Sequence, residues 1–182
     1  MYRLLTTAER IKFIREAADV QRLHVIRTIG EYSNGHHSFN MLAMLRLFWP
    51  EAPISLVWAI LEHDIPERLI GDIPSPSIHN VLSNSKEAIS NEEFSVLDMV
   101  FGDQHFVGLA PELMKWLKAL DLFELYLYIR DQMKMGNQNV SEIRQRIEER
   151  IMNNPHDYPP QVLNAFYEIR RSDWNYLPDL GV

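Results

Sequence analysis

Apolar and polar positions alternate with the period of an α-helix along most of the 182-residue chain. The clearest example is residues 36–49, a helix that Pro50 is expected to end. Its inward-facing residues are predicted to be Phe39, Leu42, Met44, Leu45 and Phe48. Further helices are predicted over residues 8–20, 53–70, 91–101, 111–134, 140–152 and 159–172. No segment shows the strict alternation of a strand followed by a hairpin turn. The sequence therefore predicts an all-α fold of about six or seven helices, in a single domain over residues 1–182.

The predicted helix over 53–70 differs from the others in being apolar on nearly every face until Glu62. Such a helix is expected to lie in the centre of a domain, with Trp58 in the core. Ionisable residues then follow closely within the run LEHDIPERLIGDIPSPS, residues 61–77. Their concentration at the end of a buried helix indicates a functional site.

Composition narrows the chemistry of that site. The chain has a formal net charge of −7, which argues against a surface that grips nucleic-acid phosphates. It has no cysteine, so a metal site would have to use histidines and carboxylates. The charged N-terminal segment does not resemble a signal peptide, and no apolar run is long enough to span a membrane. We therefore expect a cytoplasmic protein.

Three predicted helices carry groups that could share one divalent metal ion. His63 and Asp64 are adjacent, and Glu67 is expected on the same helix face as His63, about 6 Å away. Asp121 interrupts the apolar run WLKALDLFELYLY, where a carboxylate needs a partner such as Lys118 or a cation. His37 begins a third helix, although His36 beside it is an alternative.

This order of residues resembles the HD-domain metal phosphohydrolases. The similarity is greatest to the branch that contains bacterial 5′-deoxynucleotidases and small phage dNTP triphosphohydrolases. In that branch HD is followed by a run similar to H-D-x-x-E-x-x-x-G-D-[IL]-P-[ST]-P, and this chain has HDIPERLIGDIPSP over 63–76. Arg22, fifteen residues before His37, resembles the phosphate-binding arginine of the family. His37-Ser38 and the stretch KALD over 118–121 resemble two further family motifs.

The resemblance implies a role for each matching residue. It implies four metal ligands, His37, His63, Asp64 and Asp121. It implies Glu67 as a general base or water-orienting group, whereas Asp72 is either an acid–base group or the organiser of its loop. It implies that Arg22 binds phosphate. The candidate substrate-binding residues are Arg22, Leu23, Val25, Pro76, His79, Lys86 and Lys118. The chain departs from the family at Leu23, where a tryptophan is common, and at Ile78, where His79 or Lys86 would replace a common lysine. Such nitrogen and oxygen ligands suit Mn²⁺, Co²⁺, Zn²⁺, Fe²⁺ or Mg²⁺, and the sequence does not choose among them.

The function implied by the resemblance is metal-dependent hydrolysis of 2′-deoxynucleotides by a homo-oligomer. One reaction releases triphosphate from a dNTP, and we favour it, with dATP as a candidate substrate. The other releases the phosphate of a dNMP, as a 5′-deoxynucleotidase does. Three further alternatives are a catalytically silent nucleotide sensor, a cyclic-nucleotide phosphodiesterase and a helical interaction protein.

Overall fold

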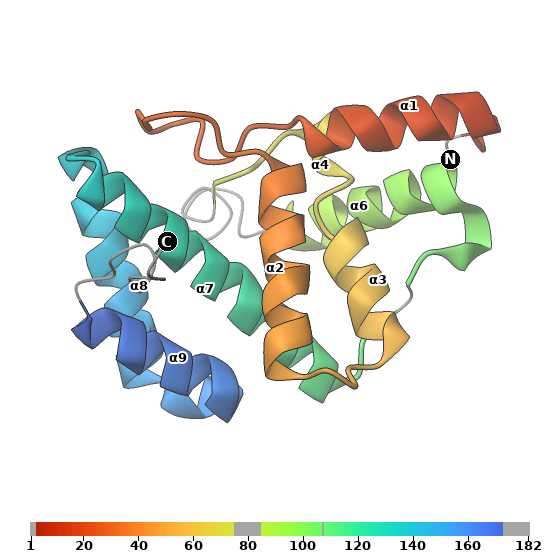
Figure 1. Ribbon diagram of the computed structural model, residues 1–182. Coiled ribbons are helices and arrows are strands. Elements are labelled where there is room, and N and C mark those ends of the chain that lie inside the picture. Colours follow the sequence, from red (N-terminus) through yellow and green to blue (C-terminus); the bar gives the residue numbers. More distant parts are fainter. Residues whose placement is uncertain (1–2, 75–84, 107, 173–182) are drawn as a thin grey trace, which may run out of the picture.

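The computed structural model describes residues 3–74, 85–106 and 108–172, and within them it is all-α (Figure 1). Seven helices of nine or more residues account for most of this part of the chain, as the sequence predicted. They are α1 (Thr7–Ala18), α2 (Asn34–Phe48), α3 (Ile54–Glu62), α6 (Lys86–Phe101), α7 (Pro111–Lys134), α8 (Ser141–Asn153) and α9 (Pro160–Arg171). Four short elements complete the set, namely α4 (Glu67–Ile70) and the 3-10 turns Gly102–Gln104, Gln138–Val140 and Pro155–Asp157. The described residues contain no β-strand, only an isolated antiparallel bridge between Gln21 and Ser33.

Helix α7 is the central element of the fold. Helices α2 and α3 pack against it on one side, and α8 and α9 pack against it on the other (Figure 1). Leu120 and Phe123 of α7 are buried in the main hydrophobic core with Met41 of α2 and Ile60 of α3. A smaller core joins α1 to α6 around Phe13 and Val100. Apolar burial thus fixes α2, α3 and α7, the helices that carry the candidate ligands.

The helix predicted over 53–70 is interrupted in the structure. Helix α3 ends at Glu62, a turn follows, and the short α4 begins after Pro66. Proline has no N–H to continue the helical hydrogen bonds and disfavours helical geometry in the residue before it. The prediction that Glu67 shares a helix face with His63 was therefore wrong, because the two residues belong to different elements.

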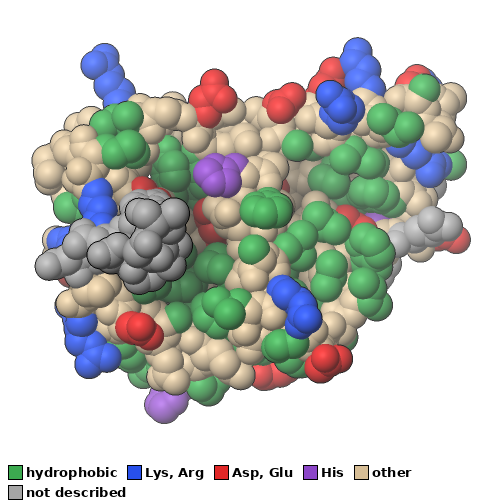
Figure 2. Space-filling view, in the orientation of Figure 1, with side chains coloured by type: hydrophobic (Ala, Val, Ile, Leu, Met, Phe, Trp, Pro, Cys, Tyr) green, Lys and Arg blue, Asp and Glu red, His purple; other side chains and the backbone are tan. Residues whose placement is uncertain are grey.

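Two aromatic residues expected in the core are instead exposed. Phe39 is 70% exposed on α2 and Trp58 is 49% exposed on α3. Leu47 and Ile54 are exposed as well, and Figure 2 shows hydrophobic side chains gathered over the region where α3 lies. The inward face of α2 is formed by His37, Met41 and Leu45, and Leu42, Met44 and Phe48 pack partly buried against the core. Of the five residues predicted to face inward, Phe39 is therefore the one that does not.

The described helices include none whose length and hydropathy would suit a membrane span.

Candidate metal centre

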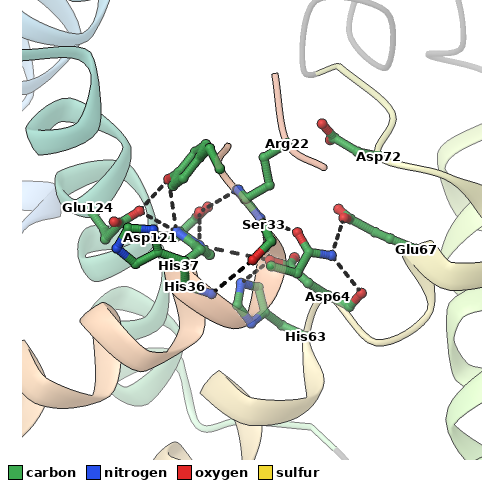
Figure 3. Close-up of polar contacts among 12 residues, drawn as sticks. Arg22, Ser33, His36, His37, His63, Asp64, Glu67, Asp72, Asp121 and Glu124 are labelled. Atoms are coloured by element: carbon green, nitrogen blue, oxygen red, sulfur yellow. Dashed lines mark hydrogen bonds and ion pairs between the residues drawn. The ribbon is translucent and has the colours of Figure 1, made fainter. Parts of the chain in front are cut away.

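His37 is placed by the start of α2. Ser33 caps this helix by accepting a hydrogen bond from the backbone N–H of His36. His36 is exposed, whereas the His37 side chain is completely buried. The His37 Nδ1 atom lies 2.5 Å from Oε2 of Glu124 on α7 (Figure 3). The structure thus selects His37 over His36 as the residue that faces the site.

His63 follows directly after α3, and its ring is oriented by the backbone. Its Nδ1 atom lies 2.8 Å from the carbonyl oxygen of Ile60. Because a carbonyl oxygen only accepts hydrogen bonds, Nδ1 must carry the proton. The other ring nitrogen, Nε2, lies 3.2 Å from Oδ2 of Asp64.

The Nε2 atoms of the two histidines converge beside Asp64. His37, His63 and Asp64 each offer a ligand atom, and these atoms lie within 4.8 Å of one another. Figure 3 shows the three side chains approaching from α2 and from the end of α3. Both Nε2 atoms are buried without a hydrogen-bond partner. Two imidazole nitrogens and a carboxylate suit a divalent transition metal, so this group could hold a metal ion.

Asp121 adjoins this group through His37. Its Oδ1 atom lies 3.1 Å from His37 Nε2, close enough for an ion pair but without the geometry of a hydrogen bond. Although desolvation opposes ionisation, His37 and Arg22 lower the pKa of Asp121, so this carboxylate is charged. Asp121 is partly exposed and could serve as a fourth ligand.

Arg22 lies between the two carboxylates. Its guanidinium forms a close ion pair with Asp64 and donates a 3.3 Å hydrogen bond to Oδ1 of Asp121. The backbone N–H of Arg22 donates to the carbonyl of Tyr32, next to the bridge between Gln21 and Ser33. This pairing closes the loop between α1 and α2 and brings Arg22 to the start of α2.

Glu67 is held at the edge of the site by Asn34. The Nδ2 atom of Asn34 donates a 2.7 Å hydrogen bond to Glu67 Oε2 and a 3.3 Å bond to the backbone carbonyl of Asp64. Burial and the neighbouring Asp64 carboxylate raise the pKa of Glu67 to about 8. Glu67 is thus a carboxyl group whose proton exchanges near neutral pH, a property that general bases need.

Asp72 organises a loop. Its Oδ2 atom accepts a hydrogen bond from the backbone N–H of Leu23 and lies 3.5 Å from Nδ1 of His24. Leu23 has a φ of 54°, the left-handed region that costs a non-glycine residue energy. Of the two roles left open for Asp72, these contacts favour the loop organiser, and Figure 3 shows Asp72 apart from the ligand group.

The other predicted substrate residues that the structure describes are Val25, Lys86 and Lys118. Val25 is 62% exposed, and Lys86 is the first residue of α6. Lys118 lines a separate cavity, beside residues of α8 and of the turn after it. Pro76 and His79 lie outside the described residues.

Glu124 is the main site residue that the sequence analysis missed. It accepts hydrogen bonds from the Tyr32 hydroxyl and, at 2.9 Å, from Asn40 Nδ2, besides its contact with His37. Although burial opposes it, the hydrogen bond with His37 lowers the pKa of Glu124. The signal was present in the sequence, because Glu124 interrupts the same apolar run as Asp121, one turn later. Asn34 and Tyr32 gave no comparable signal.

Comparisons of the chain with protein-family models and with curated proteins found no match.

Proposed function

We propose that the protein is a metal-dependent phosphohydrolase of 2′-deoxynucleotides, of the HD-domain type. The observation that carries this proposal is the convergence of two buried Nε2 atoms with Asp64, next to an arginine. Neither nitrogen has a hydrogen-bond partner, and one divalent cation would be bound by both once His37 has lost its proton. Arginine beside such a centre provides the planar charge that binds phosphate oxygens.

Four residues would hold the metal: His37, His63, Asp64 and Asp121. A bound divalent ion would polarise the phosphoryl group and lower the pKa of a water molecule. Asp121 belongs to this set because it lies 3.1 Å from the same His37 nitrogen that faces the group.

The other residues would act on the substrate and on the attacking water. Arg22 would neutralise charge on phosphate oxygens, since its guanidinium already lies at Asp64 and Asp121. Glu67 would accept a proton from water, with Asn34 fixing the direction of its carboxyl group. Asp72 would keep the Leu23 loop in place beside Arg22.

We favour the reaction that converts a dNTP, with dATP as a candidate, into deoxynucleoside and triphosphate. A 5′-deoxynucleotidase acting on dNMPs would use the same residues. A product-resolved assay separates the two reactions. Purified protein is incubated with each dNMP, dNTP and NTP and with Mn²⁺, Co²⁺, Zn²⁺ or Mg²⁺, and the products are separated by chromatography.

Triphosphate and nucleoside from one dNTP would support the favoured reaction and identify its base. Orthophosphate and nucleoside from dNMPs would establish the nucleotidase instead. His63→Ala should abolish either reaction while the far-UV circular dichroism stays unchanged. Hydrolysis that persists in folded His63→Ala protein would contradict the proposed metal centre. If the wild-type protein hydrolyses nothing, the hydrolase proposal fails, and nucleotide binding without turnover would indicate a sensor.

A further inference from the structure

The cavity lined by Lys118 lies away from the metal centre, between the first turns of α7, the end of α8 and the turn Pro155–Asp157. Its volume is about 370 Å³, within the usual range of small-molecule sites. Four basic side chains line it, and none of them belongs to the metal centre: Lys115, Lys118, Arg150 and His156.

The positive charge of this cavity is largely unpaired. Arginines elsewhere in the described part of the chain form salt bridges, as Arg68 does with Glu16 and Arg146 with Glu142. Within the same residues, no salt bridge involves any of the four basic side chains of the cavity. Asp157 is the one acid in the lining. In a chain with a net charge of −7, two lysines and an arginine grouped in this way are suited to binding an external anion.

Arg150 lines the cavity beside a buried aromatic side chain. Tyr158 is only 8% exposed, and the charge of Arg150 opposes the rise in the pKa of the Tyr158 hydroxyl that burial causes. Lys115 and Lys118 are three residues apart on α7, so their side chains project from the same face of the helix, one turn apart. An arginine and two lysines that line one cavity, the lysines on one rigid helix, are a suitable arrangement for several phosphate groups.

We propose that this cavity binds a small polyphosphate, either inorganic or as the phosphate chain of a nucleotide. Lys115 and Arg150 would contact the phosphate oxygens from opposite walls, and Lys118 would add charge at the side nearer the metal centre. Because Lys118 precedes Asp121 by one turn of α7, the bound anion would lie on the helix that carries a proposed metal ligand. The inference rests on the cavity and its charges and does not depend on the proposed hydrolase activity.

Isothermal titration calorimetry with sodium tripolyphosphate tests this proposal. The full-length protein is titrated in EDTA, so that metal-dependent binding and hydrolysis do not contribute. We expect binding that weakens as salt is raised, and an affinity lower by about tenfold or more in the double variant Lys115→Gln/Arg150→Gln. Arg146→Gln is the control for the arginine substitution, because it removes one positive charge one turn earlier on α8, outside the cavity. Circular dichroism checks that each variant is folded.

Two results would overturn the proposal: no binding at millimolar tripolyphosphate, or equal affinity in the double variant and the wild type. The second result would assign the anion to another cationic site, such as Arg22. Binding should persist in His63→Ala, and its loss there would also contradict a separate site. Titration with dATP distinguishes an inorganic polyphosphate from a nucleotide as the ligand. An affinity for dATP equal to that for tripolyphosphate indicates recognition of the phosphate chain alone. A higher affinity for dATP indicates that the nucleoside contributes.

Discussion

The Glu124 carboxylate lies 2.5 Å from Nδ1 of His37 and thereby connects α7 to α2. Glu124 is itself fixed by Tyr32 and Asn40. A histidine whose Nδ1 is bound to a carboxylate presents Nε2 in one orientation, and carboxylate–histidine pairs of this kind increase the basicity of metal-binding imidazoles. This relationship is the main reason to interpret His37 as a ligand and not as an ordinary core histidine.

Replacing Glu124 should weaken metal binding without unfolding the protein. In Glu124→Gln the carboxylate charge is lost, so His37 is less basic and less firmly oriented. We expect the affinity for Mn²⁺ or Zn²⁺ to fall by roughly 10–100-fold, as measured by calorimetry. Glu112→Gln, an exposed change in the first turn of the same helix, should leave the affinity unchanged. Equal affinities in the two variants would contradict a supporting role for Glu124.

Metal binding should release a proton from His37. Although burial opposes the charged form, the contacts with Asp121 and Glu124 raise the pKa of His37 to about 9 in the metal-free protein. The imidazolium must lose its Nε2 proton to become a ligand, so about one proton should leave per metal at pH 7. Calorimetry in HEPES and in Tris, which differ in ionisation enthalpy, measures this number. Identical observed enthalpies in both buffers would show that His37 does not deprotonate.

Glu67 should make the metal-free protein less stable as the pH rises. Its pKa is raised from 4.5 to about 8 in the folded state, so between these values the folded chain holds a proton that the unfolded chain has lost. Its contribution to the free energy of unfolding is therefore greatest below about pH 4.5 and falls as the pH approaches 8. Urea unfolding at pH 5 and pH 8 in EDTA should show a smaller pH dependence in Glu67→Gln than in the wild type. The raised pKa of His37 also makes the protein less stable as the pH rises, but His37 is present in both proteins. An equal pH dependence of the free energy of unfolding in Glu67→Gln and the wild type would contradict the burial of Glu67.

Two leucines on α2 test how this helix is oriented. Leu45 is 2% exposed and Leu47 is 74% exposed. Leu45→Ala should lower the free energy of unfolding by about 2–5 kcal/mol because it leaves a cavity in the main core. Leu47→Ala should change it by less than about 0.5 kcal/mol. Denaturant unfolding gives both values, and similar losses for the two variants would show that α2 is rotated from the position described.

The sequence predicted helices well where strong local signals bound them. The predicted helix over 111–134 matches α7 at both ends, because Pro111 begins it and Gly136 follows it closely. The break after α3 could also have been predicted, since Pro66 lies inside the apparent helix. Helical period alone did not fix which apolar residues are buried, because Phe39 and Trp58 lie on helices whose other faces pack against the core.

The candidate site was only partly predictable. The sequence indicated that His63, Asp64 and one of two adjacent histidines come together, and the structure brings His37 to the other two. The partners that orient these side chains were harder to find, because Asn34 and Tyr32 are uncharged and lie far from Glu67 and Glu124 in sequence. Closeness in sequence was also misleading. Lys118 precedes Asp121 by one turn of α7, but its side chain lines the separate cavity and not the candidate metal centre.

The most direct test of the proposed metal centre compares two adjacent histidines. His37→Gln removes the buried candidate ligand, and His36→Gln makes the same chemical change on the exposed neighbour. Mn²⁺-dependent hydrolysis of deoxynucleotides and the stoichiometry of bound metal are measured for both folded variants and the wild type. We predict that His36→Gln behaves as the wild type and that His37→Gln loses both metal and activity. Activity and metal retained in His37→Gln would contradict the central claim.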